Sequence, residues 1–141
     1  MRVEALSIMV VHVASLGAQC VPDPIVTSKI QGRVLFSGNS RNTPLDGTEI
    51  KILPYAYAKP AIAETITNAE GAFTISGIRP GRYYLSVRHP ALIGFNFEVR
   101  LKGTEASADK DIEILLRNDP RSECGGASAK LETPMRKQKH K

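Results

Sequence analysis

The sequence predicts an all-β protein, a seven-stranded antiparallel β-sandwich. Apolar and polar residues alternate with a period of two through most of residues 29–116, which is the pattern of strands with one buried face. Turn-forming residues separate these runs at short intervals, and no run shows the period of an amphipathic helix. Short strands of this kind bury one face each when they form two packed sheets.

The first predicted strand shows the alternation clearly. Ile30, Gly32, Val34 and Phe36 fall on one face, and the residues between them fall on the other face. Six further runs follow the same pattern, each bounded by glycine, proline, asparagine or serine. The seven predicted strands cover residues 29–36, 49–52, 64–67, 72–76, 82–88, 95–102 and 111–116.

Two tight turns are expected between these strands. Asn68 and Gly71 stand where a four-residue hairpin turn uses a side-chain cap and a residue that tolerates positive φ. Pro80 and Gly81 mark a second reversal, because proline fixes φ and glycine frees the backbone. The core residues that we expect next to these turns are Phe73, Tyr83 and Leu85.

Length and charge indicate one folded domain followed by a tail. A chain of 141 residues is long enough for one ordinary core, which we assign to residues 25–118. Most of the net charge of +5 comes from Lys and Arg after Pro120. Residues 119–141 show no apolar period, so we expect a flexible basic tail, and its deletion from residue 128 should leave the melting temperature nearly unchanged.

The first residues resemble a secretory signal peptide. In residues 1–18, Arg2 precedes an apolar run that ends in small residues, and the run is too short to cross a membrane as a helix of ~20 residues. Glu4 and His12 depart from this pattern. The alternative is an N-terminal strand or helix that packs on the domain. Export predicts a secreted, periplasmic or cell-surface location.

Cys20 and Cys124 flank the predicted domain, and two interpretations remain open. An even cysteine count in an exported chain favours a disulfide between them. The other possibility is lipidation of Cys20 after cleavage of the signal peptide, which would attach the chain to a membrane. Gln19 stands where a lipid-attachment motif requires a small residue, so the disulfide is the preferred interpretation.

Three motifs together resemble the carboxypeptidase regulatory-like domain family. They read G-R-V at residues 32–34, P-L-D-G-T-E-I at residues 44–50, and T-N-A-E-G-A-F-T-I-S-G-I-R-P-G-R-Y-Y-L from residue 67 to residue 85. The resemblance covers roughly residues 29–116. It implies a prealbumin-like (transthyretin-like) sandwich that is usually exported and accessory to a larger activity. It implies no shared catalytic site.

Candidate catalytic chemistry is sparse. After export only His89 and His140 remain as histidines, and no nucleophile-elbow, zinc-helix or phosphate-loop motif occurs. Transthyretin-like ureide hydrolases share the general fold but close with Tyr-Arg-Gly-Ser, whereas this chain closes with Lys-Gln-Lys-His-Lys. We therefore predict a protein that is not an enzyme, with no catalytic, cofactor-binding or metal-binding residues. A small hydrolase using His89 is the more distant alternative.

A binding surface is the remaining possibility. The aromatic residues expected to face outward are Tyr55, Tyr57 and Tyr84, which makes a carbohydrate-binding domain the first alternative. The preferred hypothesis is an exported, non-catalytic module with a binding or structural role. Its partner would be a protein or glycan outside the cell or at the cell surface, and nucleic acid is not expected because the basic residues form a solvated terminus.

Overall fold

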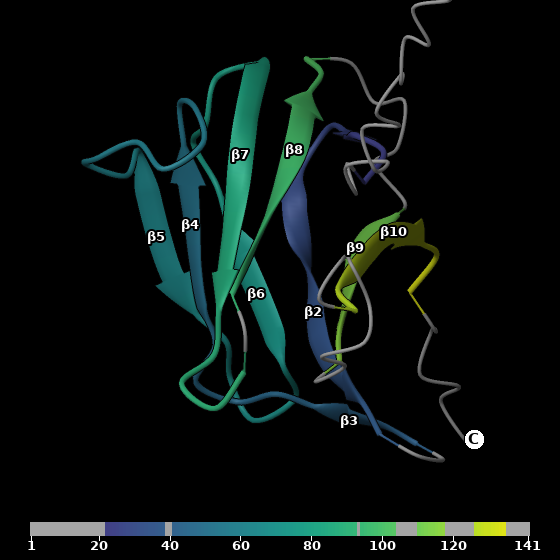
Figure 1. Ribbon diagram of the computed structural model, residues 1–141. Coiled ribbons are helices and arrows are strands. Elements are labelled where there is room, and N and C mark those ends of the chain that lie inside the picture. Colours follow the sequence, from purple (N-terminus) through teal and green to yellow (C-terminus); the bar gives the residue numbers. More distant parts are fainter. Residues whose placement is uncertain (1–21, 39–40, 93, 104–109, 118–125, 135–141) are drawn as a thin grey trace, which may run out of the picture.

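The protein is a β-sandwich, as the sequence predicts (Figure 1). A computed structural model describes residues 22–38, 41–92, 94–103, 110–117 and 126–134. Every regular element in this part of the chain is a strand. The strands are β1 (Ile25–Thr27), β2 (Ile30–Ser37), β3 (Asn42–Pro44), β4 (Glu49–Leu53), β5 (Ala63–Ile66), β6 (Ala72–Ile75), β7 (Gly81–Arg88), β8 (Phe95–Leu101), β9 (Asp111–Leu116) and β10 (Ser128–Glu132).

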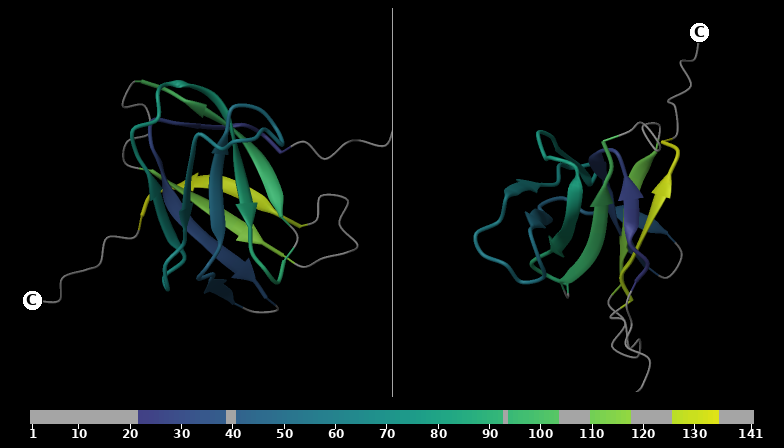
Figure 2. Two further views of the ribbon diagram at one scale, coloured as in Figure 1. Left: turned by 90° about the vertical axis from the view of Figure 1, so that its left-hand side faces the viewer. Right: turned by 90° about the horizontal axis from the view of Figure 1, so that it is seen from above.

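Two sheets face each other across the core (Figure 2). Sheet A has the order β1-β8-β7-β4-β5, and sheet B has the order β10-β9-β2-β3, with β6 also paired to β2. The pairs β1–β8 and β2–β9 are parallel, so the prediction of a wholly antiparallel sandwich was wrong in this respect. Pairing between strands that are distant in the sequence depends on crossovers, which hydrophobic alternation does not encode.

All seven predicted strands are present, and they correspond to β2 and to β4 through β9. The count of seven was nevertheless too low, because β1, β3 and β10 are additional. β1 and β3 have three residues each, which is too short to show a period of two, and β3 contains Pro44. All three additional strands lie at the edges of their sheets, where a strand pairs with one neighbour only.

The inward faces of both sheets form one hydrophobic core. Its central side chains are almost completely buried and come from strands on both sides of the sandwich. Phe73 and Leu85 belong to this core, as expected. Tyr83 is only partly buried, and its hydroxyl donates a hydrogen bond to the Arg79 carbonyl oxygen at 2.7 Å. The fully buried members are Val34, Ile50, Ile52, Leu85, Val87, Phe97, Val99, Ile112 and Ile114.

The predicted turn between β5 and β6 is present, but the predicted hairpin was wrong, because β5 pairs with β4 in sheet A and β6 pairs with β2 in sheet B. Asn68 Oδ1 accepts hydrogen bonds from the backbone N–H groups of Glu70, at 3.1 Å, and Ala72, at 2.9 Å. Gly71 has a φ of 70°, a conformation in which a side chain would be strained. The side-chain cap and the glycine together form the turn that carries the chain from sheet A to sheet B.

The prediction of a flexible tail over residues 119–141 was wrong for residues 128–132, which form β10. β10 pairs antiparallel with β9, and its Ala129 and Leu131 pack against the core. On the outer face the Lys130 ammonium lies 2.6 Å from a carboxylate oxygen of Glu132. Their hydrogen bond lowers the pKa of Glu132 and raises the pKa of Lys130 relative to the usual values. The alternation in β10 is short and weakly apolar, which explains why the pattern was missed.

Deletion of residues 126–141 is therefore expected to destabilise the domain, contrary to the expectation from sequence. The loss of the half-buried Leu131 and the uncovering of β9 should lower the free energy of unfolding by roughly 2 kcal/mol. Deletion of residues 135–141 alone is the control, because it leaves β10 in place. Urea denaturation measures both variants, and equal stability of the two would show that β10 contributes nothing.

Several predictions fall outside the described residues. The proposed signal peptide at residues 1–18, Cys20 and Cys124 belong to this part of the chain, so the disulfide and the lipidation alternative stay predictions. Among the described residues, none forms a helix with the length and hydropathy needed to span a membrane.

Candidate functional site

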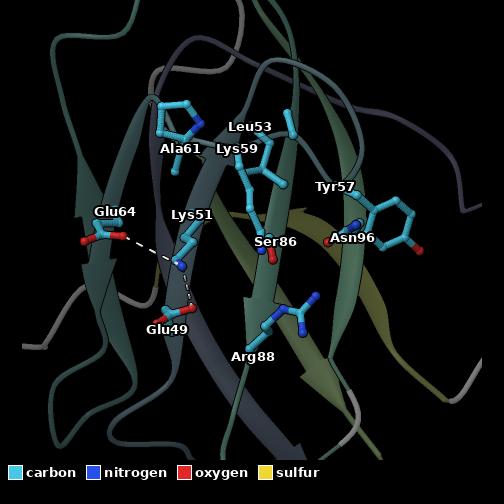
Figure 3. Close-up of a pocket in the computed structure, with 12 residues that line it drawn as sticks. Glu49, Lys51, Leu53, Tyr57, Lys59, Ala61, Glu64, Ser86, Arg88 and Asn96 are labelled. Carbon is cyan, nitrogen blue, oxygen red and sulfur yellow. Dashed lines mark ion pairs between the residues drawn. The ribbon is translucent and has the colours of Figure 1, made fainter.

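A pocket of about 1020 Å³ lies on the outer face of sheet A (Figure 3). Its floor consists of side chains from β4, β5, β7 and β8, and its wall is the loop between β4 and β5. The pocket thus lies between the outer face of four neighbouring strands and the loop that folds over them. The lining residues are Glu49, Lys51, Leu53, Tyr57, Ala58, Lys59, Pro60, Ala61, Glu64, Ser86, Arg88 and Asn96.

The register of the sheet places four polar side chains in one row across the pocket floor. Ser86 of β7 is paired with Asn96 of β8 on one side and with Lys51 of β4 on the other. Lys51 is paired in turn with Glu64 of β5. Because alternate residues of a strand point to opposite faces, Arg88 lies on the same face as Ser86, two positions further along β7.

Ser86 creates the depth of the pocket. Its side chain is small and stands between two longer ones, Asn96 and Lys51, in the same row. Only 4% of Ser86 is exposed, although it lies on the outer face of the sheet. Among the described residues no side chain or backbone group forms a hydrogen bond with its hydroxyl. The floor of the pocket therefore presents an accessible hydroxyl that is free to bond with a ligand.

The loop above the floor is held in a conformation that exposes Tyr57. The Ala58 N–H donates a hydrogen bond to the Tyr55 carbonyl at 3.1 Å, which closes a turn, and Ala58 is 5% exposed. Tyr57 has a φ of 62°, and it is the one non-glycine residue with positive φ in the described part of the chain. Its side chain is 78% exposed. Turns with this backbone conformation usually contain Gly or Asn at such a position.

The charges of the pocket are unevenly paired. Lys51 Nζ lies 3.2 Å from Glu49 Oε1 and 3.9 Å from Glu64 Oε2, as the dashed lines in Figure 3 show. Both carboxylates that line the pocket are therefore associated with Lys51. Arg88 and Lys59 form no ion pair with any described residue. Lys51 and its two carboxylates together carry a charge of −1, and Arg88 and Lys59 add two positive charges, so the lining as a whole carries a charge of +1.

The chain matches a known protein family. The model of the second β-sandwich domain of the BOS complex subunit NOMO1-like proteins matches residues 28–117, which is more than half of the chain. The chain belongs to this family. β1 and β10 lie outside the matched region in this member. The match confirms the prealbumin-like sandwich, and no curated protein matches the chain.

Two solved structures are similar to this member of the NOMO1-like family at low sequence identity. Klebsiella pneumoniae 5-hydroxyisourate hydrolase has 16% identity and a TM-score of 0.47 over 74% of this chain and 97% of the hydrolase. An (S)-allantoin synthase has 15% identity and a TM-score of 0.40 over 75% of this chain and 45% of the synthase. Similarity at this level does not extend to the chemistry of the pocket.

The three tyrosines proposed as a ligand surface have different surroundings in this NOMO1-like domain. Tyr57 lines the pocket, and Figure 3 shows its ring beside Asn96. Tyr55 is 65% exposed on the same loop but does not line the pocket. Tyr84 lies on the outer face of β7, half-buried, in register with Leu53 and Glu98. The aromatic surface is therefore centred on Tyr57 rather than on a row of three rings.

His89 has a structural role in the turn after β7. The Ala91 backbone N–H donates a hydrogen bond to His89 Nδ1 at 3.2 Å. The Leu92 N–H also bonds to the His89 carbonyl oxygen at 3.1 Å. His89 does not line the pocket on sheet A. Within the described residues no group of three His, Cys, Asp or Glu side chains is placed to hold a metal ion.

The sequence interpretation missed most of the polar residues in the pocket. Ser86, Arg88 and Asn96 occupy outward positions of predicted strands, where polar residues are ordinary surface residues. Only the strand order brings them together, and alternation does not give strand order. One signal was available in β7, because Ser86 is a small residue between large outward neighbours, Tyr84 and Arg88.

Proposed function

We propose that this chain is a non-catalytic binding module and that the pocket on sheet A is its contact surface. The backbone of Tyr57 carries the proposal. A tyrosine at a φ of 62° costs on the order of 1 kcal/mol relative to a relaxed backbone, and this residue contributes no core packing in return because it is 78% exposed. Such strain persists at ligand-binding positions, where the exposed side chain provides the benefit.

The family supports a role in a protein assembly. Its members are named for a subunit of the BOS complex, and a β-sandwich domain of such a subunit can act through surface contacts. The resemblance to carboxypeptidase regulatory-like domains points to the same accessory role. We propose in addition that the chain is exported, because of the signal-like residues 1–18. The use of His89 Nδ1 in a turn supports a module without hydrolase activity.

The substitution Tyr57→Gly tests the proposal without unfolding the protein. Glycine accepts positive φ, so the variant should be as stable as the original chain or more stable by up to about 1 kcal/mol. Removal of the ring from the pocket should abolish the recovery of the partner with the tagged chain from cells of its source organism. Quantitative mass spectrometry of co-purified proteins measures that recovery, and thermal unfolding measures stability.

The matched control is Tyr55→Ala. Tyr55 is on the same loop and is also largely exposed, but it does not line the pocket. Partner recovery with this variant should be unchanged. If Tyr57→Gly retains the full set of co-purified proteins, the pocket is not the contact surface and the proposed function is wrong.

A carbohydrate ligand is the second candidate. The exposed Tyr57 ring beside Asn96, above a floor that includes Arg88, combines an aromatic surface with the polar groups that a sugar needs. A glycan array with the wild-type chain, Tyr57→Ala and Tyr84→Ala tests this candidate. Binding to a defined glycan that disappears in these variants would favour a sugar over a protein partner.

A further inference from the structure

We propose that the pocket on sheet A recognises a carboxylate side chain on an acidic segment of the partner protein, with Arg88 as the main anchor. This inference rests on the proposed function and specifies the chemistry of the partner. Arg88 and Lys59 are the two lining cations that have no ion-pair partner among the described residues. Both side chains are exposed, so they can attract an anionic group that enters the pocket and contact it directly.

Neutral donors beside these cations complete an anion site. Ser86 presents its hydroxyl on the pocket floor, and Asn96 is its direct cross-strand neighbour. Figure 3 shows the guanidinium of Arg88 directed into the space between Ser86 and Tyr57, with Lys59 extending over the floor from the loop. A carboxylate accepts several hydrogen bonds, and the planar guanidinium can bind both of its oxygens.

The shape of the pocket favours a peptide segment. Its volume of about 1020 Å³ is open along the sheet, with apolar wall residues Ala58, Pro60 and Ala61 next to the cations. An extended segment can place one acidic side chain at Arg88 and neighbouring apolar atoms against this wall. Glu64 lies on the β5 side of the pocket, whereas Glu49 on β4 is the direct cross-strand neighbour of Arg88. The ligand carboxylate therefore belongs on the β8 side of Arg88, near Ser86 and Asn96 and away from Glu49.

Fluorescence anisotropy with a short, labelled, glutamate-rich peptide tests the inference on the full chain. The glutamine-substituted peptide of the same length is the first control. We expect the glutamate peptide to bind and the glutamine peptide not to bind, with affinity falling as salt rises above about 0.1 M. Arg88→Gln should weaken binding about tenfold or more, and Lys59→Gln should weaken it several-fold.

Arg100→Gln is the matched variant for net charge. Arg100 lies on the same face of sheet A, but it is next to Glu98 and does not line the pocket, so its loss should change the affinity less than about twofold. Equal weakening by Arg88→Gln and Arg100→Gln would overturn the inference, because it would indicate unspecific attraction. Binding of polygalacturonate in place of the peptide would also overturn it and would assign the pocket to an acidic sugar.

The peptide-binding experiment and the partner-recovery experiment can fail independently of each other. If neither anion binds but partner recovery still depends on Tyr57, the carboxylate inference fails and the binding module stands. If partner recovery is independent of Tyr57, the proposed function fails whatever the peptide does. Thermal unfolding of Arg88→Gln should match that of the original chain, because Arg88 is exposed and unpaired among the described residues.

Discussion

Replacement of Gly32 with alanine is expected to prevent folding. Gly32 lies in β2, in register with Ile112 of the parallel neighbour β9 and with Phe73 of β6 on its other side. A Cβ at this position would lie 1.8 Å from the Ile112 carbonyl oxygen and 2.7 Å from its carbonyl carbon. These are backbone atoms of a central strand pair, so no side-chain rotation can relieve the overlap.

We expect a loss beyond about 4 kcal/mol, which is most of the stability of an ordinary domain. Far-ultraviolet circular dichroism and the soluble yield measure the effect. Gly77→Ala is the control, because Gly77 has a positive φ of 79° but no atom within 4 Å of the added Cβ. It should cost only about 1 kcal/mol. A Gly32→Ala variant that folds with near-original stability would mean that β2 and β9 are not paired as described.

Truncation of Phe97 is expected to have the second largest effect. Phe97 is fully buried in the centre of sheet A, in register with Leu85, and its ring centroid is 4.8 Å from that of Phe95. Phe97→Ala should lower the free energy of unfolding by about 3–5 kcal/mol, since it removes buried apolar surface and leaves a cavity. Urea denaturation with an unchanged slope would attribute the loss to the native core.

Phe95→Ala provides the comparison on the same strand. Phe95 is only partly buried at the edge of the core, so its truncation should cost clearly less than that of Phe97. A loss at Phe97 of less than about 1 kcal/mol would contradict the assignment of the inward face of β8. A larger loss at Phe95, which lies on the same face, would contradict the position of Phe97 deeper in the core than Phe95.

Much of the fold could be predicted because the core strands are long and regular. β2, β7 and β8 have seven or eight residues each, enough for alternation to identify the buried face. β10 was missed because its residues, Ser-Ala-Lys-Leu-Glu, contain one large apolar side chain, and pairing with β9 supplies the rest of its stability. Leu35 departs from the pattern in another way, because it is buried although it is outside the core cluster.

The site was less predictable than the fold for a physical reason. Tyr57 could be proposed from the sequence because an exposed aromatic residue in a loop is unusual in itself. Ser86 and Arg88 gave no such signal, because their importance arises from the pairing of β7 with β4 and β8. The positive φ of Tyr57 was also invisible, since nothing in the local residues Tyr-Ala-Tyr-Ala demands it.

Site-specific photo-cross-linking tests the central claim most directly. A photoreactive phenylalanine at position 57 keeps an aromatic ring at the mouth of the pocket, and the same residue at position 74 places it on the exposed face of β6 in sheet B. In cells of the source organism, we expect a defined protein adduct from position 57 and none from position 74. Adducts of equal yield at both positions, or adducts from position 74 alone, would contradict a contact surface on sheet A.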